Sequence, residues 1–215
     1  MVSLRQYYLQ QLGVDVWQTR PQKPKLVEPT NQEGLEALCE RVSQCTRCAL
    51  HTTRTQTVFA RGCPQASLMI IGEAPGFHED KQGEPFVGRA GLLLDKMLLS
   101  IGLSPQDVYI ANVLKCRPPN NRDPNREEIE QCQGFLMEQI AAVNPKVILA
   151  VGRFAGQFIV NRPDSLSSLR RKTHSYQTIP VIISYHPAYL LRNPADKRKA
   201  YEDLLVVRQQ LQVHL

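Results

Sequence analysis

Four cysteines carry the first chemical signal in this sequence. Cys45 and Cys48 are separated by two residues, so a single turn of backbone can aim both thiolates at one point. Cys116 and Cys132 follow much later, and Cys116 stands in a Lys-Cys-Arg-Pro-Pro run. Four thiolates favour either zinc or an iron–sulfur cluster, and their spacing does not distinguish the two. We therefore predict a metal centre that joins two distant segments of the chain.

The other two cysteines are interpreted as ordinary buried thiols, which is the common behaviour of a free cysteine. Cys39 falls in an apolar helical pattern with Leu35 and Leu38, and Cys63 precedes a proline in a predicted turn. We find no apolar stretch of membrane-spanning length and no secretory pattern. We therefore expect a cytoplasmic protein without a membrane partner, in which the cysteines stay reduced.

The length and charge of the chain set broad limits on its organisation. A chain of 215 residues can bury one substantial core, and its formal net charge of +6 suits a polyanionic partner without identifying it. Residues 18–30 contain three prolines and little apolar material, so we predict that residues 1–30 form a poorly ordered extension with a linker. Residues 31–215 are predicted to form one domain, and we expect a monomer.

Buried strands and amphipathic helices alternate along this predicted domain. Continuous apolar runs predict strands at residues 67–71, 108–113, 146–151 and 180–185. Helical patterns occupy residues 31–42, 90–101, 125–143, 153–160 and 194–212. This alternation predicts an α/β fold of three layers, α/β/α, with a central four-stranded parallel sheet. Ligands of such sheets bind beyond the carboxyl ends of the strands.

The segments that follow these predicted strands resemble a known family. The first strand is followed by Gly72-Glu73-Ala74-Pro75-Gly76, the second reaches Asn112, and the fourth precedes a His-Pro-Ala-Tyr-Leu-Leu-Arg run that starts at His186. Together with the Phe-Val-Gly-Arg-Ala-Gly run from Phe86 and the four cysteines, they resemble a family 4 uracil-DNA glycosylase, the iron–sulfur type. The resemblance covers residues 39–210.

This resemblance implies a DNA repair enzyme and a cofactor. Such enzymes hydrolyse the N-glycosidic bond of deoxyuridine in DNA, release uracil and leave an abasic site, after the nucleotide has been flipped out of the duplex. The resemblance also implies a [4Fe-4S] cluster as the metal centre, with zinc as the less favoured occupant. The ligands would be Cys45, Cys48, Cys116 and Cys132.

The resemblance assigns roles to individual residues around the flipped base. Phe86 would stack against the uracil, and Asn112 would accept a hydrogen bond from uracil N3–H while donating to O4. His186 would donate to uracil O2, where negative charge develops as the bond breaks. The backbone of Gly72, Glu73 and Ala74 would surround the uracil and the hydrolytic water.

The group that activates water stays open at this point. Better-known uracil glycosylases carry an aspartate where this chain has Ala74, so the candidates are nearby polar residues. These candidates are Glu73, Glu79, Asp80 and Asn121. Gly76 also replaces a bulky residue that blocks the thymine methyl group in other families, and we hypothesise that Glu79 fills that space.

Apolar and basic residues are expected to contact DNA around the pocket. Leu190 and Leu191, beside Arg192, are predicted to form a wedge that enters the vacated base stack. Possible phosphate ligands are Arg117, Arg122, Arg126, Arg170, Arg171 and Lys172. The metal centre is expected to hold the segment from Cys116 to Cys132 in a defined shape rather than take part in hydrolysis.

Two other functions remain compatible with the sequence. One is a glycosylase-like iron–sulfur protein that binds nucleic acid without cleaving it, which the alanine at position 74 leaves possible. The other is a hydrolase of nucleotides or nucleosides in the same fold class, in which zinc occupies the cysteine site. The sequence does not identify a replication or repair partner for the N-terminal extension.

Overall fold

The computed structural model describes residues 31–170, 172 and 174–213. The extension predicted over residues 1–30 lies outside the described residues. The strands are β1 (Arg61–Gly62), β2 (Leu68–Gly72), β3 (Val108–Asn112), β4 (Val147–Val151), β5 (His174–Tyr176) and β6 (Ile179–Ser184). They form one six-stranded sheet in the order β1-β3-β2-β4-β6-β5.

The centre of the sheet is parallel, as predicted. β3, β2, β4 and β6 are parallel neighbours and correspond to the four apolar runs of the sequence. β1 and β5 are additional edge strands, antiparallel to β3 and β6 respectively. These edge strands have only two and three residues and no fully buried position, so no apolar run marks them.

Eight α-helices and three short 3₁₀ helices accompany the strands in the described part of the chain. The α-helices are α2 (Asn31–Ser43), α3 (Phe77–Gln82), α4 (Arg89–Leu99), α5 (Arg126–Val143), α6 (Arg153–Val160), α7 (Leu166–Leu169), α8 (Pro187–Arg192) and α9 (Lys197–Val213). The 3₁₀ helices are η1 (Ala49–Thr52), η2 (Pro119–Asn121) and η3 (Pro194–Asp196). The helix predicted over residues 194–212 therefore begins slightly later, after η3.

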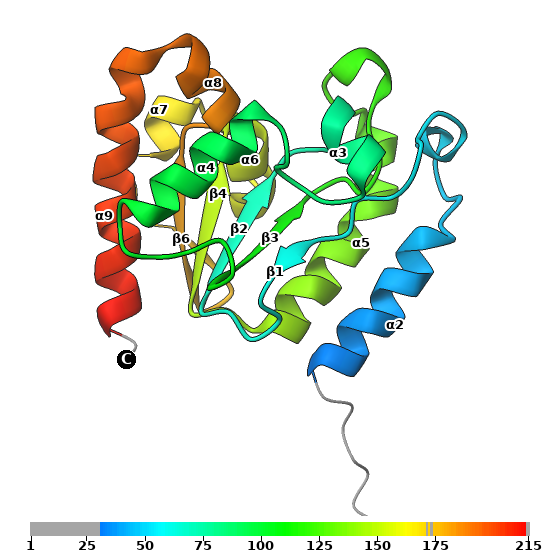
Figure 1. Ribbon diagram of the computed structural model, residues 1–215, viewed down its shortest axis with the longest axis horizontal. Coiled ribbons are helices and arrows are strands. Elements are labelled where there is room, and N and C mark those ends of the chain that lie inside the picture. Colours follow the sequence, from blue (N-terminus) through cyan, green and yellow to red (C-terminus); the bar gives the residue numbers. More distant parts are fainter. Residues whose placement is uncertain (1–30, 171, 173, 214–215) are drawn as a thin grey trace, which may run out of the picture.

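Helices cover both faces of the sheet, which gives the predicted three layers (Figure 1). On one face, Met69 and Ile71 of β2 join a core with α2, α5, α6 and α7. On the other face, Leu68 and Ile70 join a core with α4 and α9. All residues of β2, β3 and β4 are buried because both faces of these strands are covered. The α/β/α fold class is confirmed.

The strand order brings distant segments together at the carboxyl ends of the parallel strands. β2 lies between β3 and β4, so the loops after β2 and β3 leave the sheet side by side, with Gly72 opposite Asn112 in the register. Val151 of β4 pairs with Ser184 of β6, two residues before His186. Open parallel sheets bind ligands at such a point. The fold therefore places the three motif-bearing loops around one site.

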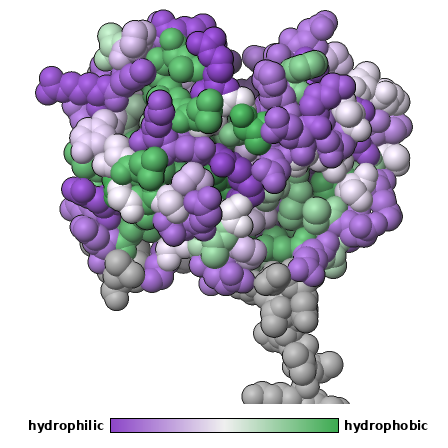
Figure 2. Space-filling model, viewed as in Figure 1, coloured by the Kyte–Doolittle hydropathy of each residue, from purple (hydrophilic) through white to green (hydrophobic). Residues whose placement is uncertain are grey.

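The surface in this view is mostly polar. Figure 2 shows hydrophilic side chains over most of the molecule, with apolar side chains in smaller groups between them. Among the described residues, no helix combines the length and apolar character that crossing a membrane requires.

Candidate active site and candidate metal centre

A pocket of about 490 Å³ opens beyond the carboxyl ends of β2, β3 and β6. Its volume falls in the range of small-ligand sites. The residues that line it are Glu73, Ala74, Pro75, Gly76, Glu79, Phe86, Ala90, Asn112, Pro118, Asn121, Arg122, His186, Ala188, Tyr189 and Arg192. The structure thus brings the predicted base-contacting residues Phe86, Asn112 and His186 into one cavity.

Asn112 presents an unused hydrogen-bond acceptor to this pocket. It is the last residue of β3, and only 2% of its surface is exposed. Its Oδ1 atom has no hydrogen-bond partner among the described residues. A buried amide oxygen without a partner is costly, and nearly all such groups are paired in folded proteins. The pocket therefore favours a ligand with an N–H group that reaches this oxygen.

Gly72 makes room for the pocket wall. A Cβ atom at Gly72 would lie 2.3 Å from Asn112 Oδ1 and 2.7 Å from Phe86 Cζ, which is too close for either neighbour. The carbonyl oxygens of Gly72 and Glu73 accept hydrogen bonds from the backbone amides of Val113 and Leu114, both at 3.0 Å. These two carbonyls therefore tie the loop after β2 to the loop after β3, and the missing side chain of Gly72 leaves room for Asn112 and Phe86.

Phe86 is held against the pocket by a strained loop. Its backbone has a φ of +57°, which phenylalanine rarely adopts, and 6% of its surface is exposed. Gly91 allows this conformation, because a Cβ atom there would lie 1.6 Å from the Phe86 carbonyl oxygen. The Phe86 ring centroid lies 5.6 Å from that of His186. The two rings thus form adjoining parts of the pocket wall.

His186 is a neutral hydrogen-bond donor in this arrangement. Its Nδ1 atom accepts from the backbone amide of Ala188 at 3.1 Å, which caps α8 and leaves the ring proton on Nε2. Burial, reinforced by the positive charge of Arg192, lowers the pKa of His186 to about 4, although Glu79 opposes this effect. The imidazole is therefore uncharged at neutral pH.

This lowered pKa has a measurable consequence for stability. The unfolded chain binds a proton at His186 near the ordinary pKa of 6.5, whereas the folded protein does so only near 4. Acidification from pH 7 to pH 5 should therefore reduce the free energy of unfolding of the wild type more than that of His186→Asn, and the contribution of His186 itself should be constant above pH 7. Urea unfolding at both pH values measures this difference. Equal losses in the two proteins would contradict a neutral His186.

Glu79 clamps the loop that carries Phe86. Its Oε1 atom accepts hydrogen bonds from the backbone amides of Val87 and Gly88, both at 3.1 Å. Its Oε2 atom lies 2.7 Å from the position that a Cβ atom on Gly76 would take. The carboxylate therefore occupies space that a side chain at Gly76 would otherwise fill, which supports the hypothesis drawn from the sequence.

The remaining candidates for water activation differ in their surroundings. Glu73 lines the pocket, and burial followed by the charge of Asp123 raises the pKa of its carboxyl group. Asn121 also lines the pocket, but its Oδ1 accepts from Arg117 Nε at 2.7 Å. Asp80 does not line the pocket; it is buried and accepts from the Thr55 amide. Asp80 is therefore a structural residue, and Glu73 has the carboxylate that remains available.

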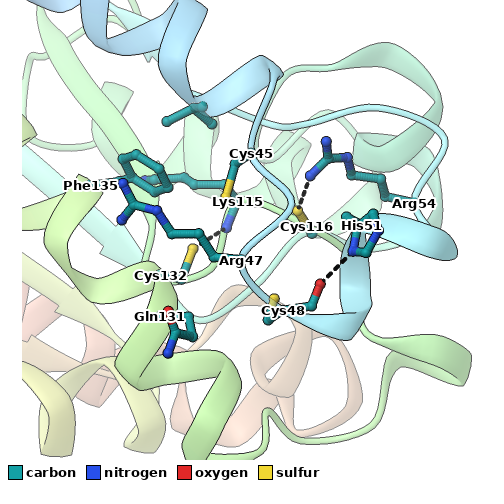
Figure 3. A pocket seen from close by; sticks show the side chains of 11 residues that line it. Cys45, Arg47, Cys48, His51, Arg54, Lys115, Cys116, Gln131, Cys132 and Phe135 are labelled. Atoms are coloured by element: carbon teal, nitrogen blue, oxygen red, sulfur yellow. Dashed lines mark hydrogen bonds between the residues drawn. The ribbon is translucent and has the colours of Figure 1, made fainter.

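The four predicted metal ligands surround a second space. Figure 3 shows their sulfur atoms between the loop after α2, the loop after β3 and helix α5. This space is small, with a cavity volume of about 10 Å³. Its lining includes Cys45, Cys48, Cys116 and Cys132, whereas Cys39 and Cys63 are absent from it. The structure thus separates the four sulfurs from the other two in the way the sequence predicted.

Hydrogen-bond donors reach two of these sulfurs and offset part of the burial that raises the pKa of the Cys116 and Cys132 thiols. Arg54 Nη1 donates to Cys116 Sγ at 3.2 Å, and the Lys115 amide donates to Cys132 Sγ at 3.3 Å. Lys115 is fully buried, and its Nζ donates to the Asn112 carbonyl at 2.7 Å and to Gln139 Oε1 at 2.5 Å. A buried ammonium needs nearby negative charge. The donor set therefore fits a thiolate-bound group, and Lys115 connects that site to Asn112.

Four cysteine ligands are compatible with either zinc or an iron–sulfur cluster. Within residues 31–170, 172 and 174–213, no three His, Cys, Asp or Glu side chains are placed to hold one metal ion.

Known proteins are similar to this chain over most of its length. The chain matches the family model described as the uracil DNA glycosylase superfamily over residues 59–206. It is 47% identical over 178 residues to a type-4 uracil-DNA glycosylase of Archaeoglobus fulgidus, covering 79% of this chain and 89% of that protein. The type-4 uracil-DNA glycosylase of Thermotoga maritima is 44% identical over 179 residues, covering 81% and 93% of the two chains. This chain belongs to the uracil-DNA glycosylase superfamily.

Within this superfamily member, the predicted wedge needs a correction. Leu190 has no exposed surface, because α8 turns its side chain toward the core, so the prediction that it enters DNA is wrong. The next residue, Leu191, is 39% exposed, and Arg192 lines the pocket. Of the two leucines, only Leu191 remains available as a wedge.

Several basic residues of this uracil-DNA glycosylase superfamily member also have structural partners. Arg170 forms a 2.8 Å ion pair with the buried Asp203, which also accepts from Ser184, and its guanidinium lies 4.4 Å from the Tyr185 ring centroid. This network supports the end of β6 just before His186. No local sequence pattern indicates this network, because its members are far apart along the chain. Arg122 lines the pocket while pairing with Glu128.

Proposed function

We propose that this protein is a type-4 uracil-DNA glycosylase that hydrolyses the N-glycosidic bond of deoxyuridine in DNA. The products are free uracil and an abasic site, as in base excision repair. The names of the type-4 relatives support this activity. The single structural observation that carries it is the unpaired Asn112 Oδ1 atom in a pocket shared with Phe86 and His186.

Base recognition follows from the hydrogen-bonding groups of this pocket. Uracil offers an N3–H donor beside the O4 acceptor, which matches the oxygen and the amino group of the Asn112 amide. Cytosine presents the reverse pattern and would leave Asn112 Oδ1 facing another acceptor. Stacking on Phe86 offsets part of the cost of flipping the nucleotide, by about 1–3 kcal/mol.

Bond cleavage uses groups on two sides of the nucleotide. As the bond lengthens, negative charge develops on uracil O2, and the neutral imidazole of His186 donates from Nε2 to that oxygen. The deoxyribose becomes cationic, and the Glu73 carboxylate stabilises this charge and orients the attacking water. Its raised pKa makes Glu73 a stronger base than an exposed carboxylate. Glu79 contributes by holding the Phe86 loop.

Glu79 is also expected to exclude thymine. Glu79→Ala should open space beside Gly76 and raise the rate of thymine release relative to uracil by about 10-fold or more, because one methyl group in a fitted pocket is worth about 10–200-fold. Uracil release should fall, since the loop amides lose their acceptor. Release from oligonucleotides that contain either base measures both rates. The exposed Glu84 provides a control, and a Glu79→Ala protein equal to Glu84→Ala on both bases would refute the role.

We further propose that Cys45, Cys48, Cys116 and Cys132 hold a [4Fe-4S] cluster. When bound, the cluster would supply strong links between the three segments that carry these cysteines. The four cysteines around one space and the donors from Arg54 and Lys115 support a thiolate-bound group, and the likeness to type-4 uracil-DNA glycosylases supports a cluster over zinc. Iron and sulfide content, together with visible absorbance of the purified protein, test this assignment. Stoichiometric zinc without iron would overturn it.

The same proposal includes the oligomeric state and the location of the protein. Residues 31–215 act as one domain that binds uracil-containing DNA as a monomer. The enzyme works in the cytoplasm with the chromosomal DNA, where cysteines remain reduced.

An oligonucleotide with a single uracil tests the function directly. The wild-type holoprotein should produce an alkali-sensitive break at the uracil and release the free base. Binding without breaks would instead support a non-catalytic binding protein. Turnover of free nucleotides or nucleosides without action on the oligonucleotide would support the hydrolase alternative.

A further inference from the structure

Phe77 is an exposed aromatic side chain at the edge of the pocket. It is the first residue of α3 and directly follows Gly76, which lines the pocket. Half of its surface is exposed, and every other phenylalanine in the described part of the chain is more buried. The other large exposed apolar residues lie on α4, α8 and α9: Leu92, Leu99, Leu191, Tyr201 and Val206.

Neighbouring side chains hold the Phe77 ring in place without covering it. The guanidinium of Arg117 lies 5.2 Å from the ring centroid, and the His78 ring meets it edge-on at 5.5 Å. Arg117 is itself fixed, because its Nε donates to Asn121 Oδ1 at 2.7 Å. A ring that is already ordered loses little conformational freedom when a ligand packs on it.

The surroundings of Phe77 identify the ligand class. Arg117 places positive charge beside the ring, whereas a protein-binding patch is usually a larger apolar surface. Aromatic rings flanked by cations bind the bases and phosphates of nucleic acid strands. α8, with Leu191 and Arg192, contributes a different part of the pocket surroundings. A DNA strand with one nucleotide in the pocket must carry its neighbours across the rim.

We propose that Phe77 is a stacking platform for the base next to the uracil in the same DNA strand, with Arg117 contacting the adjoining phosphate. This inference rests on the proposed function and extends it to a neighbouring nucleotide. It makes α3 part of the DNA-binding surface and predicts that the identity of one flanking base affects affinity.

Binding measurements with altered DNA test this contact. The probes are three single-stranded oligonucleotides that contain 2′-fluoro-deoxyuridine, which resists hydrolysis. The first has natural nucleotides on both sides of it. The second has an abasic nucleotide on its 5′ side, and the third has one on its 3′ side. Phe77→Ala holoprotein should bind the natural probe about 5- to 150-fold more weakly than wild type. That penalty should vanish for one of the two abasic probes. Phe77→Trp should retain the affinity for the natural probe, since tryptophan also stacks on bases. Leu92→Ala, which removes another exposed apolar side chain, is the control and should bind like the wild type.

Two other outcomes would contradict the proposed stacking contact. Equal binding by wild type and Phe77→Ala would remove Phe77 from the interface, and an equal penalty on all three probes would assign its effect to something other than the neighbouring base. Matching circular dichroism and visible spectra ensure that Phe77→Ala is compared as folded holoprotein. Failure of the proposed function is distinguishable, because wild type would then release no uracil from a cleavable oligonucleotide.

Discussion

His186→Ala is expected to slow uracil release by about 100- to 1000-fold, the usual cost of removing one donor to a developing oxyanion. The variant should bind uncleavable uracil-containing DNA nearly as well as wild type, since the lost hydrogen bond strengthens mainly in the transition state. The rate under single-turnover conditions and the Kd for uncleavable DNA separate these effects.

Two controls make this result specific to the donor. His186→Gln retains an amide donor and should lose less activity than His186→Ala. The Nε2 atom of His174 donates to the Leu169 carbonyl oxygen at 2.8 Å, and His174 does not line the pocket, so His174→Ala should release uracil normally. A His186→Ala enzyme within about 3-fold of the wild-type rate would remove His186 from the chemistry.

Cys132→Ala is expected to cause the largest loss of stability. Cys132 lies on α5 and faces the sulfurs from two other segments, so its removal should release iron and free the loop after β3. Structural metal sites can supply about 10 kcal/mol of folding free energy, so we expect a loss of about 5 kcal/mol or more and a Tm lower by about 10 °C or more. Iron content and thermal unfolding measure these losses.

The same variant also tests what the metal centre does. DNA affinity should fall with stability, because Lys115 links this site to the backbone of Asn112. Cys63 does not line the cysteine cavity, so Cys63→Ala should keep its iron and its Tm. Full cluster occupancy together with unchanged stability in Cys132→Ala would refute the structural role.

The sequence predicted the centre of the fold better than its edges. The four central strands are continuous apolar runs because helices cover both of their faces. β1 is Arg61–Gly62 and β5 is His174–Tyr176; these segments become strands only by pairing with β3 and β6. Their own residues carry no periodic pattern. In the same way, Leu190 is buried and Leu191 is exposed because neighbouring residues of helix α8 point about 100° apart, which an apolar pair in the sequence does not reveal.

The candidate site was also predictable from the sequence only in part. Phe86, Asn112 and His186 could be selected because they stand in motifs that follow predicted strands. The positive φ of Phe86 and the clashes that glycine prevents at positions 72 and 91 depend on distances across the fold. The same is true of the Lys115 hydrogen bonds to Asn112 and Gln139. Such contacts join residues that no local pattern relates.

The most direct test of the proposed base recognition is a crystal structure of the holoprotein with DNA that contains 2′-fluoro-deoxyuridine. We predict a flipped uracil stacked on Phe86, with Asn112 Oδ1 within about 2.7–3.2 Å of N3 and His186 Nε2 beside O2. A uracil bound in this pocket with Asn112 Oδ1 still unpaired, or bound outside the pocket, would contradict the account.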